Sequence, residues 1–272
     1  MVRSHPGPPW AISSARESTS LTLKGSQVQT LYRPPMNLEI IYEDNNLLVI
    51  NKPAGISVYS EVPVPEKTLI DYLLEEHPEV KGAGIGPRYG IVHRLDKETS
   101  GLLLVARGQE PLIFLQKQFK TRRVEKKYTA LVVGNIKEEK GKIETLIGRS
   151  PKDRMKQKVF FIGDPGSQTK REAVTEYRVV DRFLGYTLLE VTPKTGRQHQ
   201  IRCHLAYLNH PIAGDKLYGF KNQLTPKGLT HHFLHAGYLK LELPNKEIKE
   251  FKAELPEDLK NIINELKNKE HE

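Results

Sequence analysis

Cysteine is nearly absent from this chain of 272 residues, which contains only Cys203. One cysteine cannot form an internal disulfide, and a metal cage built from several thiolates is excluded as well. Long hydrophobic runs are also missing: "LLLVA" at 102–106 is typical of the longest, far short of the roughly 20 apolar residues of a membrane-spanning helix. These absences favour a protein of the reducing cytoplasm that makes no membrane contact.

Negative charge is in short supply too. Asp and Glu number 33 against 42 Lys and Arg, which gives a net charge of +9 and a pI near 9.4. This excess favours a polyanionic partner such as a nucleic acid over an acidic small molecule. A lysine-rich soluble surface accounts for the charge equally well, so charge alone leaves both interpretations open. The length suits one large domain or two small ones with a buried core.

The first 36 residues differ in composition from the rest of the chain. They contain the proline pairs at 8–9 and 34–35, scattered serines and no sustained apolar periodicity. They weakly resemble an organelle transit peptide, but the apolar stretch of a secretory signal is missing. We therefore expect an irregular tail over 1–36 and a folded domain over 37–272.

Apolar periodicity divides the remaining chain into strands and helices. The segment 38–55 has the strand, Asn-rich turn and strand of a hairpin, and 68–78 has helical spacing after a Thr that can cap. Strands are further expected at 101–107, 126–134, 142–149, 156–163, 173–183 and 186–193, and helices at 110–122, 198–209 and 256–268. Strands outnumber helices and cluster as hairpins. This predicts an α+β fold with a central mixed, largely antiparallel β-sheet flanked by helices.

Two short motifs are similar to known functional loops but do not fit them. "HRLD" at 93–96 is similar to a kinase catalytic loop, yet an extra Leu separates Arg94 from Asp96 and no Asp-Phe-Gly follows. "GAGIGPRYG" at 82–90 lacks the strand–loop–helix frame of a phosphate-binding turn. We interpret the second motif as a connector and exclude a kinase.

Six histidines in the last third of the chain raise the question of a metal site. Only the pair at 231 and 235 has the spacing of one helical turn, and it lies where a strand is expected to begin. No carboxylate pattern completes a metal shell, so we expect core or RNA-facing histidines and no metal. The six are His199, His204, His210, His231, His232 and His235.

Four ordered blocks of sequence carry the strongest signal. They are "NKPAG" at 51–55, "HRLDKETSGLLLVA" at 93–106, "KKYTALVVG" at 126–134 and "TGRQHQIRCHLAYLNHPIAGDKLYG" at 195–219. In this order they closely resemble the signature blocks of the RluA-type pseudouridine synthase family, and the resemblance runs from about residue 38 to 243. It implies the catalytic-domain fold of that family and an enzyme that isomerises uridine in RNA to pseudouridine.

The resemblance assigns the reacting groups to three positions. Asp96 would be the nucleophile, and Arg202 would pair with it, because a guanidinium stabilises an ionised carboxylate that burial disfavours. Tyr128 would lie against the uracil and is the expected base for the proton at ring carbon five, although a phenol with a pKa near 10 needs help in that role. An ordinary salt bridge and a half-buried strand tyrosine are the structural alternatives. The reaction changes no oxidation state and transfers no donor group, so no cofactor is expected.

Four further residues are expected to bind the substrate. A uridine must leave its stack to reach Asp96, and Arg94 is similar to the family arginine that enters the vacated space. One more phosphate contact is the simpler interpretation of Arg94. His93, Arg197 and Gln198 lie within the same blocks as the reacting groups and are expected to bind the RNA.

Basic segments lie before the predicted tyrosine and after it. "KQFKTRRVEKK" at 117–127 and "PKDRMKQK" at 151–158 could line an RNA groove, whose binding would weaken steeply as salt rises. The mixed signs of 245–261 indicate a solvated face. The chain departs from the family pattern in "ISVYS" at 56–60, which lacks a common His-Pro, and in Gln198, where Thr is common. Neither change removes a reacting group.

We therefore expect a cytoplasmic, monomeric RNA pseudouridine synthase that acts on ribosomal RNA or transfer RNA, with ribosomal RNA favoured by analogy. Many relatives carry a small RNA-binding module at the N-terminus, which 36 irregular residues could not form. Two other classes stay open: an RNA-binding module that remodels RNA without chemistry, and a metal-dependent nuclease. The Asp96→Asn variant separates the first class from an enzyme, and a chelator tests the second.

Overall fold

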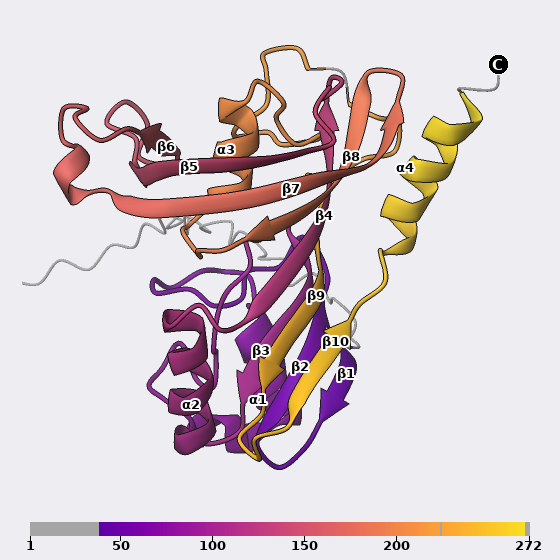
Figure 1. Cartoon of the computed structure of the whole chain (residues 1–272). Helices are drawn as coiled ribbons and strands as arrows, with labels where there is room; N and C mark the ends of the chain where they lie inside the picture. The colour runs from indigo at the N-terminus through magenta and orange to yellow at the C-terminus, as the bar shows by residue number, and fades with distance from the viewer. Residues whose placement is uncertain (1–37, 224, 270–272) are drawn as a thin grey trace, which may run out of the picture. The chain divides into compact units, whose positions relative to one another are not determined.

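The computed structural model describes residues 38–223 and 225–269, which leaves the tail expected over 1–36 outside it. A ten-stranded sheet occupies the centre of the described chain, in the order β1-β2-β3-β9-β4-β8-β7-β5-β6, with β10 paired to β9 (Figure 1). Its strands are β1 (Glu39–Glu43), β2 (Leu47–Lys52), β3 (Ser100–Ala106), β4 (Glu125–Val133), β5 (Lys140–Arg149), β6 (Gln157–Phe160), β7 (Arg171–Phe183), β8 (Tyr186–Pro193), β9 (Leu234–Glu242) and β10 (Ile248–Lys252). Every neighbouring pair is antiparallel except β3 with β9, so the predicted mixed, largely antiparallel sheet is confirmed.

The parallel contact between β3 and β9 depends on one glycine. Gly101 pairs with Ala236 and has a φ of 115°, a backbone conformation that side chains with a Cβ rarely adopt. A Cβ at this position would lie 2.3 Å from the carbonyl oxygen of Ala236. The glycine that ends "HRLDKETSG" therefore lets the two strands approach each other directly after the Asp96 loop.

Helices cover parts of this sheet, as the periodicity predicts. They are α1 (Leu69–Glu76), α2 (Gln109–Lys120), α3 (Gln200–Tyr207) and α4 (Glu257–Asn268). The predicted capping role of Thr68 is confirmed, because its hydroxyl and its backbone N–H both donate to the Asp71 carboxylate, at 2.7 Å each. Helix α2 packs beside β3, whereas α3 packs against β6, β7 and β8 (Figure 1).

Two large hydrophobic cores lie among the described residues. One joins apolar side chains of β4, β7 and β8 to those of α3 and α4, and includes the fully buried Phe233. The other joins β2, β3, β9 and β10 to α2. The Asp96 loop leads into β3 of the second core, and Arg202 is carried by α3 of the first. The fold therefore brings the predicted site together where elements of the two cores meet.

Of two strands near the C-terminus, the start of β9 was expected at the histidine pair 231 and 235, whereas β10 was not predicted. Strand β9 follows the histidines at 231 and 232, and β10 lies within 245–261, which was predicted to be a solvated face. Among the residues of β10 only Phe251 is buried. The strand is largely exposed, in keeping with a solvated face, but it was missed because its two apolar residues, Ile248 and Phe251, are three positions apart and give no alternating pattern.

Candidate active site

The loop that carries Asp96 is anchored on both sides of the carboxylate. The backbone N–H of Thr99 donates to the Asp96 carbonyl, at 3.1 Å, and closes a turn. The Thr99 hydroxyl lies 2.8 Å from Nε2 of buried His232, and the next residue, Ser100, bonds Nδ1 of buried His235 at 2.9 Å. The carboxylate of Asp96 is 21% exposed. It is therefore held in place and can still be reached by a ligand.

A charged chain runs from this carboxylate into the protein interior. Nη1 of Arg202 donates to Oδ2 of Asp96 at 2.9 Å, which confirms the contact between two residues 106 positions apart. The same guanidinium donates through Nε and Nη2 to both carboxylate oxygens of Asp215, at 2.7 and 3.0 Å. This two-bond contact fixes the plane of the guanidinium, so Arg202 presents one remaining edge to Asp96.

Asp215 was not predicted as a site residue. Its side chain is fully buried, and its Oδ1 also accepts the backbone N–H groups of Leu217 and Tyr218, at 2.9 and 3.0 Å. Burial raises the pKa of Asp215, but the hydrogen bonds and charge of Arg202 more than offset it and leave the pKa low. Burial likewise opposes the charge of Arg202, and its bonds to Asp215 and Asp96 outweigh that effect and raise its pKa. Both side chains stay charged.

A second set of hydrogen bonds leads to the other oxygen of Asp96. Nε2 of His199 lies 3.9 Å from Oδ1 of Asp96, and Nδ1 of the same ring lies 3.1 Å from the Tyr218 hydroxyl. That hydroxyl also accepts the backbone N–H of Gln157 at 2.6 Å, and it can donate its proton to Nδ1 of His199. When it does so, the proton of the neutral imidazole is on Nε2. An imidazole N–H then faces the oxygen that Arg202 does not hold.

Tyr128 lies in β4, opposite Val191 of β8, and packs against the first hydrophobic core. Burial raises the pKa of its phenol, and the charge of Asp96 raises it further. Within the described residues the hydroxyl makes no hydrogen bond, so nothing there assists deprotonation. The ring is placed near Asp96 in its neutral form, which suits contact with a base.

Arg94 and His93, adjacent in sequence, lie in different surroundings. Arg94 is exposed, with its guanidinium carbon 5.1 Å from the centre of the Tyr59 ring. His93 stacks on Phe119 with 4.6 Å between ring centres, and its Nε2 accepts the backbone N–H of Leu104 at 3.2 Å. Burial lowers the pKa of His93 to about 3, so the ring is neutral. These contacts give His93 a packing role, and its predicted role in substrate binding stays a prediction.

Arg197 and Gln198 lie on the loop that enters α3. Nε of Arg197 donates to the carbonyl of Glu172 at 2.8 Å, and its backbone N–H donates to the Gln200 side chain at 3.0 Å. Gln198 is exposed and accepts a hydrogen bond from Gln157 of β6 at 3.1 Å. The loop is thus tied to β6 and β7, and it continues directly into His199.

One buried cation was missed by the sequence analysis. Lys52 is fully buried, and its ammonium donates to the carbonyls of Pro53, Ile56 and Lys97, at 2.7, 3.0 and 3.1 Å. Burial lowers the pKa of Lys52 to about 7, against the opposing charges of Glu98 and Asp96, and the three carbonyl acceptors favour its charged form. It therefore ties "NKPAG" to the Asp96 loop. The signals for this role were its place in the block "NKPAG" and a basic residue at the end of a mostly apolar strand.

The remaining histidines have structural contacts. His204 is fully buried between the hydroxyls of Thr145 and Thr175, at 2.9 and 2.8 Å. His210 lies 2.8 Å from the Val133 carbonyl, and His231 pairs with Asp258. Within the described part of the chain, no three His, Cys, Asp or Glu side chains lie together as a metal-binding group.

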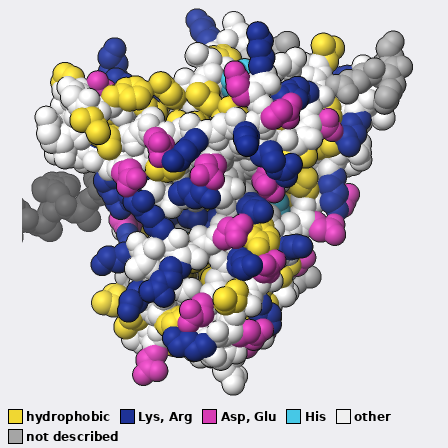
Figure 2. Space-filling model, in the orientation of Figure 1, with side chains coloured by type: hydrophobic (Ala, Val, Ile, Leu, Met, Phe, Trp, Pro, Cys, Tyr) yellow, Lys and Arg dark blue, Asp and Glu magenta, His cyan; other side chains and the backbone are white. Residues whose placement is uncertain are grey.

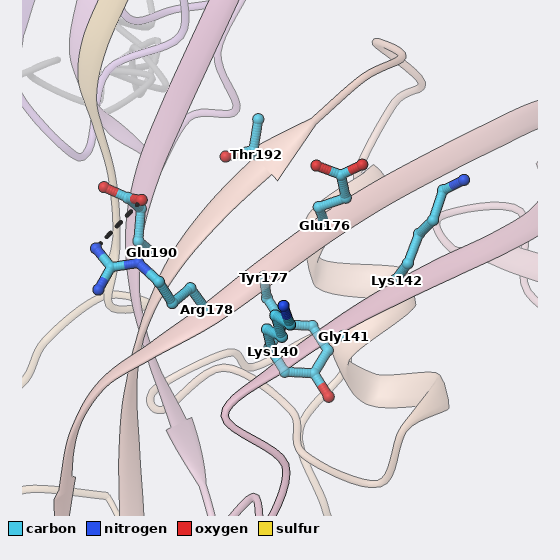
Figure 3. Close-up of a pocket in the computed structure, with 8 residues that line it drawn as sticks. All are labelled: Lys140, Gly141, Lys142, Glu176, Tyr177, Arg178, Glu190 and Thr192. Atoms are coloured by element: carbon cyan, nitrogen blue, oxygen red, sulfur yellow. Dashed lines mark hydrogen bonds and ion pairs between the residues drawn. The ribbon is translucent and has the colours of Figure 1, made fainter.

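A cavity of about 430 Å³ lies away from these groups, over the start of β5, the middle of β7 and the second half of β8. It is lined by 140–142, 176–178, Glu190 and Thr192, and we call it the paired cavity (Figure 3). Its lining has three cations, Lys140, Lys142 and Arg178, and two acids, Glu176 and Glu190; Arg178 contacts Glu190 at 3.4 Å, as the dashed line in Figure 3 marks. The acids offset most of its positive charge, which weakens the attraction for an RNA phosphate.

Comparisons with known proteins point to one family. The model of a family described as RNA pseudouridylate synthase matches residues 46–207. The "Uncharacterized RNA pseudouridine synthase YlyB" of Bacillus subtilis (strain 168) is 38% identical over 252 residues, which cover 92% of this chain and 80% of that protein. The "Ribosomal large subunit pseudouridine synthase D" of Yersinia pestis is 38% identical over 242 residues, covering 85% and 71%.

A solved structure shares the fold as well. "Human RNA Pseudouridylate Synthase Domain Containing 4" superposes with a TM-score of 0.66 at 30% identity, over 84% of this chain and 92% of that one. The resemblance noted in the four sequence blocks therefore extends to the three-dimensional structure.

Proposed function

The chain belongs to the RNA pseudouridylate synthase family, and from this premise we propose that Asp96 is the nucleophile with which it isomerises uridine in ribosomal RNA. The observation that carries the proposal is the chain from Asp96 through Arg202 to Asp215. An exposed carboxylate oxygen backed by a buried, oriented guanidinium is the arrangement that attack on a ribose carbon requires.

The geometry gives each oxygen of Asp96 a separate role. Arg202 holds Oδ2, which stabilises the carboxylate charge and leaves Oδ1 free to attack the anomeric carbon as its bond to the ring nitrogen breaks. The released uracil then turns, and ring carbon five bonds to the same anomeric carbon as the bond from that carbon to Oδ1 breaks and the Asp96 carboxylate is regenerated. The proton on ring carbon five is lost and the ring nitrogen gains one, so substrate and product have the same composition.

Tyr128 would contact the uracil during this step, and Arg94 would fill the space that the extruded nucleotide leaves in the RNA stack. The neutral Tyr128 ring offers a face for the uracil next to Asp96. Extruding the nucleotide costs a few kcal/mol, which a side chain that fills the vacated stack offsets. Arg94 is exposed and carries a planar group suited to this.

Ribosomal RNA is proposed because "Ribosomal large subunit pseudouridine synthase D" is the name of several relatives. Pseudouridine should be mapped in total RNA of cells with the gene, without it, and with the Asp96→Asn form alone. We expect one or a few uridines of large-subunit RNA to lose the modification in the last two strains. A loss confined to transfer RNA would overturn the choice of substrate, and retention in the Asp96→Asn strain would overturn the nucleophile.

We further propose that the enzyme acts as a cytoplasmic monomer. Asp96, Arg202, Tyr128 and Arg94 all come from one chain, so the site needs no partner subunit. Burial raises the pKa of Cys203 to about 12, which makes the only thiol unreactive toward a second copy. A single species of about 31 kDa in light scattering is the expected result.

A further inference from the structure

A second cavity, of about 240 Å³, lies at the opposite end of the β5–β7 pairing from the paired cavity. It is lined by 147–149 of β5, Gln157 of β6, 169–171 at the start of β7, and 196–198 of the loop before α3. We call it the basic cavity. The two cavities therefore lie at opposite ends of the stretch over which β5 pairs with β7.

The cations of the basic cavity have no acidic counterpart in its lining. Four of its residues are cationic and none is Asp or Glu; the four are Arg149, Lys170, Arg171 and Arg197. The nearby carboxylate of Glu172 is engaged by Arg122 at 2.7 Å. Figure 2 shows Lys and Arg side chains gathered below β7 and above α2, at the left of the view.

The charges there act on one another. Burial lowers the pKa of Arg197, and the charges of Arg171 and Arg122 lower it further, against the opposing charge of Glu172. Guanidinium groups repel when they are held together without an anion, and a bound anion relieves that repulsion. The surplus of positive charge is thus concentrated at this end of the two strands.

Arg197 is prepared to receive such an anion. Its Nε is fixed on the carbonyl of Glu172, whereas neither Nη group has a partner among the described residues. Two free N–H-bearing nitrogens in one plane match two oxygens of a phosphate. Arg149 and Arg171 are exposed, and neither forms an ion pair with another residue that the structure describes. Both can therefore contact an anion as well.

The loop of the basic cavity leads straight to the nucleophile. Residues 196–198 line the cavity, and the next residue, His199, faces Oδ1 of Asp96 at 3.9 Å. An anion in the cavity would lie beside the uridine that reacts. Resting on the proposed function, we propose that the basic cavity binds a backbone phosphate of the RNA next to the target uridine, with Arg171 and Arg197 as its main ligands.

The first test compares charge reversals on one strand. Arg171→Glu changes the basic cavity, and Arg178→Glu makes the same change in the paired cavity of β7. RNA binding should be measured in the Asp96→Asn background, with a transcript of large-subunit ribosomal RNA and a series of salt concentrations. We expect Arg171→Glu to raise Kd at least about 10-fold. The plot of log Kd against log salt concentration should also become less steep by about 1, as for one lost phosphate contact. Arg178→Glu should change both much less.

The second test asks whether Arg197 binds the phosphate through the paired donors of its planar guanidinium or through its charge alone. Arg197→Lys keeps the charge and loses the planar pair of donors, so Kd should rise while the salt slope stays near that of the parent. The proposal is overturned if Arg171→Glu is no more harmful than Arg178→Glu, or if Arg197→Lys binds like the parent. Because these measurements use binding alone, they can succeed even if Asp96 proves not to be the nucleophile, and the reverse also holds.

A third test locates the phosphate. Synthetic RNA carrying one neutral methylphosphonate beside the mapped uridine should bind the parent less tightly. It should cause no additional loss in Arg171→Glu, since the contact is already gone. Fully additive losses at every position beside the uridine would show that the cavity binds another part of the RNA.

Discussion

The two ends of the β5–β7 pair use the same kinds of side chain in opposite ways. At the paired cavity, Lys142, Arg178 and Lys194 contact Glu144, Glu190 and Glu176, at 2.6, 3.4 and 2.9 Å, and the side chains are largely exposed. At the other end, cations line the basic cavity without acids, and beyond its loop a buried ion pair stands behind Asp96. The net charge of +9 is therefore less informative than where charge is buried or left without a counterion.

The largest expected effect is a difference in stability between a variant that loses a buried carboxylate and one that loses an exposed carboxylate. Asp215→Asn should lower the free energy of unfolding by about 3 kcal/mol, because Arg202 stays buried and loses its two-bond partner. Urea unfolding measures this change. Glu190→Gln, which removes the exposed partner of Arg178, is the matched control, with an expected change within about 1 kcal/mol. Equal losses in both variants would contradict the account.

The next effect concerns the shape of the cation behind the nucleophile. Arg202→Lys keeps one positive charge but cannot bond Asp215 twice and Asp96 at the same time. The loss of a charge-assisted hydrogen bond to Asp96 should slow product formation about 10- to 100-fold, while RNA affinity stays close to that of the parent. Single-turnover rates at saturating RNA measure it. A Lys variant as fast as the parent would show that charge alone suffices.

A further effect, which appears only at acidic pH, should come from the middle of the same strands. His204 bridges Thr145 of β5 and Thr175 of β7, and burial lowers its pKa to about 4. The unfolded chain takes up the proton below about pH 6.5, whereas the folded chain does not until about pH 4. Stability contributed by the neutral ring is therefore complete above pH 6.5 and is lost as pH falls toward 4, by about 1.4 kcal/mol per pH unit.

His204→Gln should remove that contribution from the pH dependence. Unfolding free energies measured between pH 6.5 and 4 should then fall less steeply than in the parent, where buried His232, with a pKa lowered by burial to about 4, adds a similar slope. An unchanged slope in the variant would mean that His204 is already charged in the folded protein.

The smallest effect is expected at the paired cavity itself. Removing Arg178 and Glu190 together, as Arg178→Gln with Glu190→Gln, keeps the net charge constant and deletes one exposed ion pair. Activity and RNA affinity should be unchanged, since such pairs contribute about 0 to 1 kcal/mol. A clear loss of RNA binding in the double variant would move the RNA surface to this end of the strands.

The sequence was informative where local pattern decides structure. Apolar spacing located the hairpin at 38–55, the four helices and β3 to β8, and the ordered blocks indicated Asp96 and Arg202. It was uninformative where distant residues must meet. Asp215 lies only 13 residues after Arg202, yet no local sequence pattern shows that its carboxylate accepts two hydrogen bonds from the Arg202 guanidinium.

His93 and β10 illustrate the same limit. A histidine beside the predicted nucleophile can turn toward substrate or toward the core, and the position of Phe119 decides this. An edge strand such as β10 has a single buried residue, so its hydrogen bonds to β9 hold it rather than an apolar pattern. The orientation of His93 and the formation of β10 both depend on tertiary contacts, which the spacing of residues in the sequence does not reveal.

The most direct test of the catalytic role of Asp96 is a single-turnover assay of Asp96→Asn with RNA bound at saturation. The asparagine keeps the shape of the side chain and removes the charge that Arg202 holds. We expect the RNA to bind with nearly unchanged Kd and no pseudouridine to form above the level seen without enzyme. Pseudouridine formed at a rate close to that of the parent would contradict the account.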